Sequence, residues 1–180
     1  DEKPGMDELI YAVKSRRNTL DLKIESSVSR DGAGTYYFKE CANPMDLQTL
    51  SAEDMKELLK AIEASKNYDR VIVDLGNGLQ EKEITVMSMV NRIAMVTGTG
   101  EVDRVKLLRY LDYVQAVEET KKLDIVSKLQ IYINRTLKNA PFPEMISQIR
   151  VAGAFPLIEN GNFAGIVDKL ADMELLQAIR

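Results

Sequence analysis

The feature that most constrains this sequence is the alternation of short apolar runs with longer amphipathic stretches. The runs are rich in β-branched residues, as is typical of strands buried on both faces of a parallel sheet, and they span 70–75, 92–97, 128–134 and 148–155. Between them, residues 81–90 and 102–119 carry apolar side chains at helical spacing. Strands that alternate with helices predict an α/β fold of three layers, with a mostly parallel sheet and helices on both faces.

The amino-terminal third is expected to be mainly helical. Apolar residues at helical spacing predict a first helix over Asp7–Lys14, and the Ser51–Asp54 capping box predicts another that runs to about Ala64. Residues Thr19–Arg30 are ambiguous, although Leu20, Ile24 and Val28 recur at helical spacing. The run Asp31–Gly34 predicts a hairpin-type turn that leads into a short strand.

The carboxyl-terminal half contains the longest predicted helix, 102–119. Its buried stripe is expected to hold four apolar residues: Val105, Leu108, Leu111 and Val114. Residues 161–170 and 173–179 predict two further helices that close the chain. The nearest thing to a linker is Asn139–Pro143, and the composition does not change along the chain. We therefore expect one α/β domain over residues 1–180.

The composition excludes several classes of function. The chain has no histidine, which excludes catalytic triads and zinc sites that depend on imidazole. The formal net charge of −4 gives no basic footprint, so no nucleic-acid partner is expected. The single cysteine, Cys41, rules out an internal disulfide and fits a reducing compartment. Because no apolar run approaches the ~20 residues that span a bilayer and no secretory signal opens the chain, we expect a cytoplasmic protein.

The first candidate functional residues follow the run at 70–75. In open α/β sheets, ligands bind beyond the carboxyl ends of the strands. This run delivers Asp74, whose carboxylate can hold Mg²⁺, and then Gly76, where the backbone can turn close to a phosphate. An aspartate in this position is also typical of a helix cap or a turn. Thr97–Gly100 gives only a weak phosphate signal, because the third glycine of a dinucleotide fingerprint falls on Asp103.

Two later runs end in residues that suit a purine base. The run at 128–134 ends in Asn134 and Arg135, and an asparagine amide offers both the donor and the acceptor that a base edge needs. The last run ends in Phe155–Leu157, where an aromatic ring and a proline corner can border a base. The structural alternatives are a turn asparagine with a solvated arginine, and an ordinary strand end followed by proline.

In order and spacing, these strand ends resemble the MinD/ParA-type P-loop ATPases. Tyr68–Gly76 resembles the Walker B strand of that family, and Arg92–Thr97 resembles its following strand. Leu129–Arg135 is similar to the strand whose Asn-Arg contacts adenine, and Gly153–Pro156 to the last strand, whose proline corner borders the base. Asn43–Leu47, ahead of the helix that leads into Walker B, is most similar to the TadZ- or CpaE-like pilus-assembly branch.

The resemblance covers about residues 7–179, and it implies a nucleotide-dependent homodimer that positions pilus or secretion machinery. It leaves peripheral membrane association open. The implied cofactors are ATP and Mg²⁺, with the adenine held near the two later strand ends and the γ-phosphate sensed near Gly76. The residues implied to bind the nucleotide are Asn134, Arg135, Phe155, Pro156, Leu157 and Gly76, and the residue implied at the metal is Asp74.

One departure from the family is severe. Its glycine-rich loop with two lysines occurs nowhere in these 180 residues, so the P-loop NTPase-like fold is expected to be partial. Without that lysine and its helix N-terminus the triphosphate loses its main electrostatic hold, and we expect this chain alone to bind ATP poorly and hydrolyse none. We expect it to be the carboxyl-terminal part of a larger, weakly hydrolysing ATPase domain.

Two alternatives stay open at this point. One is a non-catalytic scaffold of the same fold, which the missing loop permits. The other is a receiver-type signalling domain, because Asp74 and Thr97 imitate its phosphoacceptor and its switch hydroxyl. Against the receiver, Asn134 and Arg135 stand where that class needs a lysine.

Overall fold

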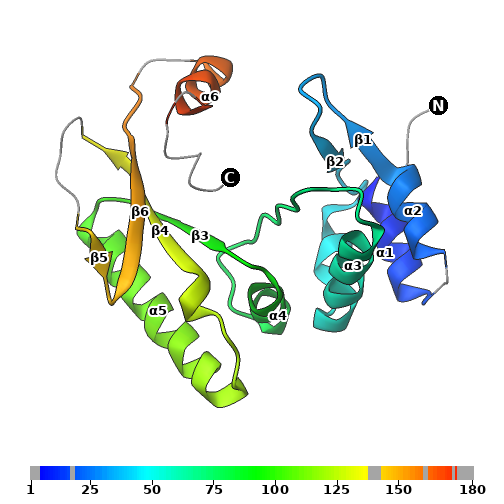
Figure 1. Cartoon of the computed structure of the whole chain (residues 1–180), viewed down its shortest axis with the longest axis horizontal. Helices are drawn as coiled ribbons and strands as arrows, with labels where there is room; N and C mark the ends of the chain where they lie inside the picture. The colour runs from blue at the N-terminus through cyan, green and yellow to red at the C-terminus, as the bar shows by residue number, and fades with distance from the viewer. Residues whose placement is uncertain (1–4, 17–18, 138–142, 160–161, 172, 174–180) are drawn as a thin grey trace. The chain divides into compact units, whose positions relative to one another are not determined.

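The structure is a computed structural model that describes residues 5–16, 19–137, 143–159, 162–171 and 173. The chain divides into two compact units, Asp1–Met89 and Val90–Arg180, and each unit has buried residues of its own. Figure 1 colours the first unit blue to green and the second green to red. The first unit is mainly helical, whereas the second is built on a sheet.

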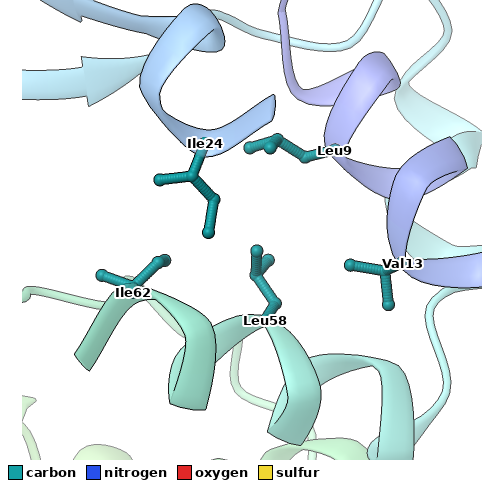
Figure 2. Packing of buried hydrophobic residues seen from close by; sticks show 5 residues of the cluster. All are labelled: Leu9, Val13, Ile24, Leu58 and Ile62. Atoms are coloured by element: carbon teal, nitrogen blue, oxygen red, sulfur yellow. The ribbon is translucent and has the colours of Figure 1, made fainter. Parts of the chain in front are cut away.

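Three helices form the core of the first unit: α1 (Met6–Lys14), α2 (Leu20–Ser27) and α3 (Ala52–Ser65). Their apolar residues recur every three or four positions, which places them on one face of each helix. Figure 2 shows five of these side chains converging between the helices: Leu9, Val13, Ile24, Leu58 and Ile62. Each is at most 7% exposed, and burial of such a side chain contributes about 1.5–3 kcal/mol.

The predicted capping box starts α3. The Asp54 backbone N–H donates to the Ser51 hydroxyl at 3.1 Å, and the Ser51 N–H donates to the Asp54 carboxylate at 2.9 Å. The hydrogen bond from the Ser51 backbone holds the pKa of Asp54 below its ordinary value. Two backbone N–H groups that the helix cannot satisfy are therefore paired, as the sequence predicts.

A hairpin follows α2 directly, so the ambiguous residues Thr19–Arg30 form a helix and then a strand. Strand β1 (Val28–Arg30) pairs antiparallel with β2 (Tyr36–Phe38). The predicted turn between them is confirmed, since the Asp31 carboxylate accepts two backbone N–H groups of the turn. Gly34 closes the turn with φ +93°, a conformation that favours glycine. The unit also contains η1 (Pro44–Thr49) and α4 (Glu81–Met89).

Residues 70–75 do not form the strand that the sequence predicts. The structure assigns no helix or strand from Arg70 to Gly76. Ile72 is 84% exposed and Val71 is 44% exposed. An apolar run becomes a strand when it pairs with neighbouring strands that also cover its side chains. No described strand pairs with residues 70–75.

The second unit is built on four strands in the order β3-β4-β6-β5. These are β3 (Ile93–Thr97), β4 (Leu129–Thr136), β5 (Met145–Ile146) and β6 (Ile149–Pro156). β4 is parallel to β3 on one side and to β6 on the other, while the short β5 is antiparallel to β6 (Figure 1). The three longer strands fall where the sequence predicts them, and β5 is the one that it misses.

Helix α5 (Glu101–Lys121) connects β3 to β4, and η2 (Val126–Lys128) leads into β4. A shorter helix, α6 (Phe163–Ala171), follows β6. These helices confirm the predictions at 102–119 and 161–170. Residues 174–179 of the helix predicted at 173–179 and most of the linker at 139–143 lie outside the described residues, and Met173 forms a bend.

The buried stripe of α5 differs from the predicted one. Its buried residues are Leu107, Leu111 and Val114, while Val105 is 44% exposed. Val105 and Val114 are nine positions apart, which is two and a half turns, so they lie on opposite sides of the helix. The predicted stripe therefore mixed two faces.

The α/β fold class, with a mostly parallel sheet flanked by helices, is confirmed. Among the described residues, no helix combines the length and the apolar character that a bilayer crossing needs.

Candidate functional site

The predicted purine-binding residues lie at the carboxyl ends of two neighbouring parallel strands. Asn134 and Arg135 come near the end of β4, Phe155 and Pro156 end β6, and Leu157 follows directly. The register pairs Thr136 with Pro156, and the Leu157 N–H donates to the Thr136 carbonyl at 2.8 Å. We call the five predicted residues the β4/β6 edge: Asn134, Arg135, Phe155, Pro156 and Leu157. The structure brings these five together.

A β-bulge shapes this edge. Ile133 pairs with Ala154 and the next pair joins Thr136 to Pro156, so two residues of β4 face one residue of β6. The two residues in the bulge are Asn134 and Arg135. Bulges re-aim side chains and are over-represented beside active sites. The bulge therefore takes the predicted base-reading pair out of the regular alternation of the strand.

The backbone of Arg135 is strained. Its φ is +60°, in the left-handed region that costs a non-glycine residue roughly 1–2 kcal/mol. Asn134 supports this conformation, because its side-chain Oδ1 accepts a hydrogen bond from the Arg135 N–H at 2.9 Å. Oδ1 has a second lone pair, so the amide still offers an acceptor as well as its Nδ2 donor to a ligand. Asn134 is half-buried and Arg135 is exposed, an arrangement that puts a guanidinium beside a fixed amide.

The β6 side of the edge rests on an aromatic pair. Tyr132 is 1% exposed and stacks on Phe155, with ring centroids 5.8 Å apart and planes at 23°. Burial raises the pKa of Tyr132, so the phenol stays neutral. Phe155 and Pro156 are half-buried, while Leu157 is 42% exposed. A flat apolar surface next to polar groups is what a planar base requires.

The end of β3 does not offer a phosphate site. Gly98–Gly100 leads into the N-terminus of α5, but an Asp103 carboxylate oxygen accepts from the Gly100 N–H at 3.3 Å. A Cβ on Gly98 would lie 2.2 Å from that oxygen, so a larger residue there would displace the Asp103 carboxylate. Because Asp103 and Glu101 put two negative charges in the first turn, this helix end repels phosphate.

Asp74 and Gly76 lie in the first unit, in the segment that forms no strand. Both are exposed. A Cβ on Gly76 would meet nothing within 4 Å, so packing does not demand glycine at this position. Their predicted roles at the metal and at the γ-phosphate stay predictions.

The residues present fit one end of a nucleotide better than the other. The β4/β6 edge supplies an amide that can both donate and accept, a guanidinium and an apolar platform, which together suit adenine. For Mg²⁺, no three acidic, cysteine or histidine side chains among the described residues are placed so that they could hold a metal ion together. Mg²⁺ in nucleotide sites is often held by one or two carboxylates together with water and phosphate oxygens, so Asp74 alone is sufficient in number. Nothing in the described chain provides the lysine loop that grips phosphates.

Cys41 is excluded as a nucleophile. It is buried, and burial, followed by its hydrogen bond with Asp7, raises the pKa of the thiol to about 11. A thiol with so high a pKa is almost fully protonated at neutral pH and is a poor nucleophile.

Two residues that build the edge, Tyr132 and Thr136, are not among those predicted from the sequence. The sequence marks Tyr132 only as one residue of an apolar run, and Thr136 lies beyond the predicted end of the strand. The pattern Asn-Arg-Thr does carry a signal, since a threonine directly after the polar pair continues the β propensity of β4. The stacking of Tyr132 on Phe155 required the strand register, which the sequence does not give.

Comparison with known proteins finds likeness in solved structures but not in sequence. No family model and no curated protein sequence matches the chain. Among solved structures, the ParA family ATPase from Chlorobium tepidum TLS is similar, with a TM-score of 0.66 and 14% sequence identity. The match covers 99% of this chain and 70% of that ATPase. At this identity the likeness shows a ParA-like fold.

Proposed function

We propose that this chain is the adenine-binding part of a MinD/ParA-type ATPase. One observation carries the proposal: the bulge of β4 and the carboxyl end of β6 gather Asn134, Arg135 and Phe155–Leu157 at one edge of a parallel sheet. That edge is where open α/β sheets bind their ligands. The ParA-like fold supports the same proposal, and the resemblance to that family implies that these five residues contact adenine.

The proposed cofactors are ATP and Mg²⁺. In the intact protein the Asn134 amide and the Arg135 guanidinium contact the base, and Phe155, Pro156 and Leu157 form its apolar wall. Asp74 helps to hold Mg²⁺, which neutralises phosphate charge when bound, and Gly76 belongs to the segment that senses the γ-phosphate. The glycine-rich lysine loop is supplied from outside these 180 residues, and the intact protein hydrolyses ATP weakly.

The cellular role that we propose is that of the TadZ/CpaE-like branch. In this role a bacterial, cytoplasmic protein uses ATP as a switch for homodimerisation and so localises pilus or secretion machinery. Peripheral association with the membrane is compatible with it, and no nucleic-acid partner is expected. The residues Asn43–Leu47 support the choice of branch, and the net charge of −4 supports the absence of nucleic acid.

The test is a titration of a fluorescent ATP analogue with Mg²⁺ into the full-length protein. Asp74→Asn is the matched variant, because Asp74 is exposed and the substitution preserves its size. We expect saturable binding by the wild type and binding about tenfold or more weaker in the variant, since one charged metal ligand is lost. Equal affinities would remove Asp74 from the metal site. Absence of binding by the folded wild type would overturn the ATPase proposal.

A second titration uses the 180-residue chain alone. We expect weak binding and no hydrolysis, because the phosphates lack their loop. Turnover well above background in a pure preparation would contradict this.

A non-catalytic scaffold is the second candidate. One observation favours it: the helix N-terminus at Gly98–Gly100 carries Asp103 in place of a group that attracts phosphate. The scaffold predicts that the full-length protein binds no nucleotide and that Asp74→Asn changes nothing. The first titration therefore separates the two candidates.

A further inference from the structure

Thr136 is a buried polar side chain at the last position of β4. It is 8% exposed, and its Oγ1 donates to the Phe155 carbonyl at 3.1 Å. Its own carbonyl accepts from the Leu157 N–H at 2.8 Å. These two hydrogen bonds fall on either side of Pro156, which has no N–H to donate. Thr136 therefore joins the end of β4 to β6 through both its side chain and its backbone.

The position of these bonds matters because they close the bulge. The last regular pair before the bulge joins Ile133 to Ala154, and the first pair after it joins Thr136 to Pro156. Between them Arg135 is held at φ +60°. A residue in this region persists when its surroundings over-determine its backbone. The Asn134 amide restrains Arg135 from one side, and the Thr136 bonds restrain it from the other.

The same bonds set the spacing between the polar and the apolar parts of the edge. Asn134 and Arg135 stand on β4, whereas the apolar wall belongs to β6. Base recognition depends on where the Asn134 amide lies relative to the wall. A base that rests on a displaced wall meets the amide at a poorer angle, and a hydrogen bond weakens steeply when its angle falls below ∼120°. If β6 shifted relative to the bulge, each residue would keep its place on its own strand. The polar pair on β4 and the apolar wall on β6 would nevertheless be misaligned.

We propose that Thr136 is the positioning residue of the β4/β6 edge: its hydroxyl fixes β6 against the bulge, so that the amide of Asn134 reads a base held against Phe155–Leu157. This rests on the proposed adenine-binding function. Thr136 itself does not touch the base. Its effect should appear in the preference for adenine over guanine, because a misplaced amide matches the donor and acceptor of the adenine edge less well.

The experiment compares Thr136→Val and Thr136→Ser in the full-length protein. Valine keeps the branched shape and removes the hydroxyl, and serine keeps the hydroxyl. Thr97→Val is the control, since it makes the same change at the end of the neighbouring strand β3. The probes are fluorescent analogues of ATP and GTP with Mg²⁺, and thermal unfolding is recorded for each variant.

We expect Thr136→Val to weaken binding of the ATP analogue about five- to tenfold, with a smaller change for the GTP analogue, so that the preference falls. Thr136→Ser should restore the preference to within about twofold of the wild type, and Thr97→Val should leave it unchanged.

An unchanged ATP-to-GTP preference in Thr136→Val, with only a lower unfolding temperature, would show a purely structural threonine and overturn this inference alone. A wild type that binds neither analogue would overturn the proposed function and this inference together. The two failures are therefore distinguishable.

Discussion

Two apolar runs of similar character, Val71–Leu75 and Leu129–Ile133, have different fates in this molecule. Both are rich in β-branched or apolar side chains, and each has a polar residue at or just beyond its carboxyl end, Asp74 in the first and Asn134 after the second. The second is the centre of a sheet, with β3 on one side and β6 on the other. The first has no described strand beside it, and its Ile72 is 84% exposed. The difference teaches that such a run specifies a strand only where neighbouring strands cover it.

The same difference separates the two units. The core cluster of the first lies between helices whose apolar faces are set by local spacing and by the Ser51–Asp54 cap. The buried residues of the second lie largely on strands that pair across long stretches of sequence. Local signals should therefore control stability in the first unit, and strand neighbours in the second.

The largest expected effect on stability is found by making the same isoleucine-to-alanine substitution in each of the two runs. Ile131 is 0% exposed, so Ile131→Ala should destabilise the protein by about 2–5 kcal/mol through lost burial and a cavity. Ile72→Ala should change stability by less than about 0.5 kcal/mol, because the side chain is already in water. Urea unfolding followed by circular dichroism measures both. Similar losses in the two variants would mean that the first run is packed as the second is, and the comparison would fail.

An intermediate effect is expected at the cap of α3. Asp54→Ala should cost about 1 kcal/mol at neutral pH, because it leaves the Ser51 N–H without its acceptor. The adjacent Glu53→Ala is the control, since its ion pair with Lys56 is exposed and contributes little.

The pH dependence of the cap gives a sharper version of this test. The folded-state pKa of Asp54 lies below its unfolded value, so the stabilisation is present above the unfolded pKa and is lost as the pH falls through the folded one. The difference between wild type and Asp54→Ala should therefore shrink as the pH drops below about 4. A constant difference across this range would show that the carboxylate charge does not act at the cap.

The smallest stability effect is a gain. Arg135→Gly should stabilise the fold by about 0.5–1 kcal/mol, because glycine adopts φ +60° without strain but loses more chain entropy on folding. The same variant should bind the ATP analogue more weakly, since the guanidinium is lost. Stability is measured by thermal unfolding and affinity by titration. If Arg135 were only a turn residue, stability would rise and the affinity would stay that of the wild type.

Much of the fold could be predicted because it depends on local signals. The capping box at Ser51, the turn at Asp31 and the runs that became β3, β4 and β6 each carry their reason within a few residues. The failures are non-local. Residues 70–75 lacked a partner strand, and the register of β4 against β6 decided where Asn134 and Arg135 would bulge. The candidate edge could be named from its strand ends, whereas the roles of Tyr132 and Thr136 required the contact between two strands.

The most direct test of the central claim locates the adenine by photolabelling. The full-length protein is irradiated with 8-azido-ATP and Mg²⁺, and the modified peptides are identified by mass spectrometry. The account predicts saturable labelling of peptides that contain Asn134–Leu137 or Phe155–Leu157, suppressed by excess ATP and much less by excess GTP. Saturable labelling confined to other peptides, or labelling that excess ATP does not suppress, would contradict the assignment of this edge to adenine.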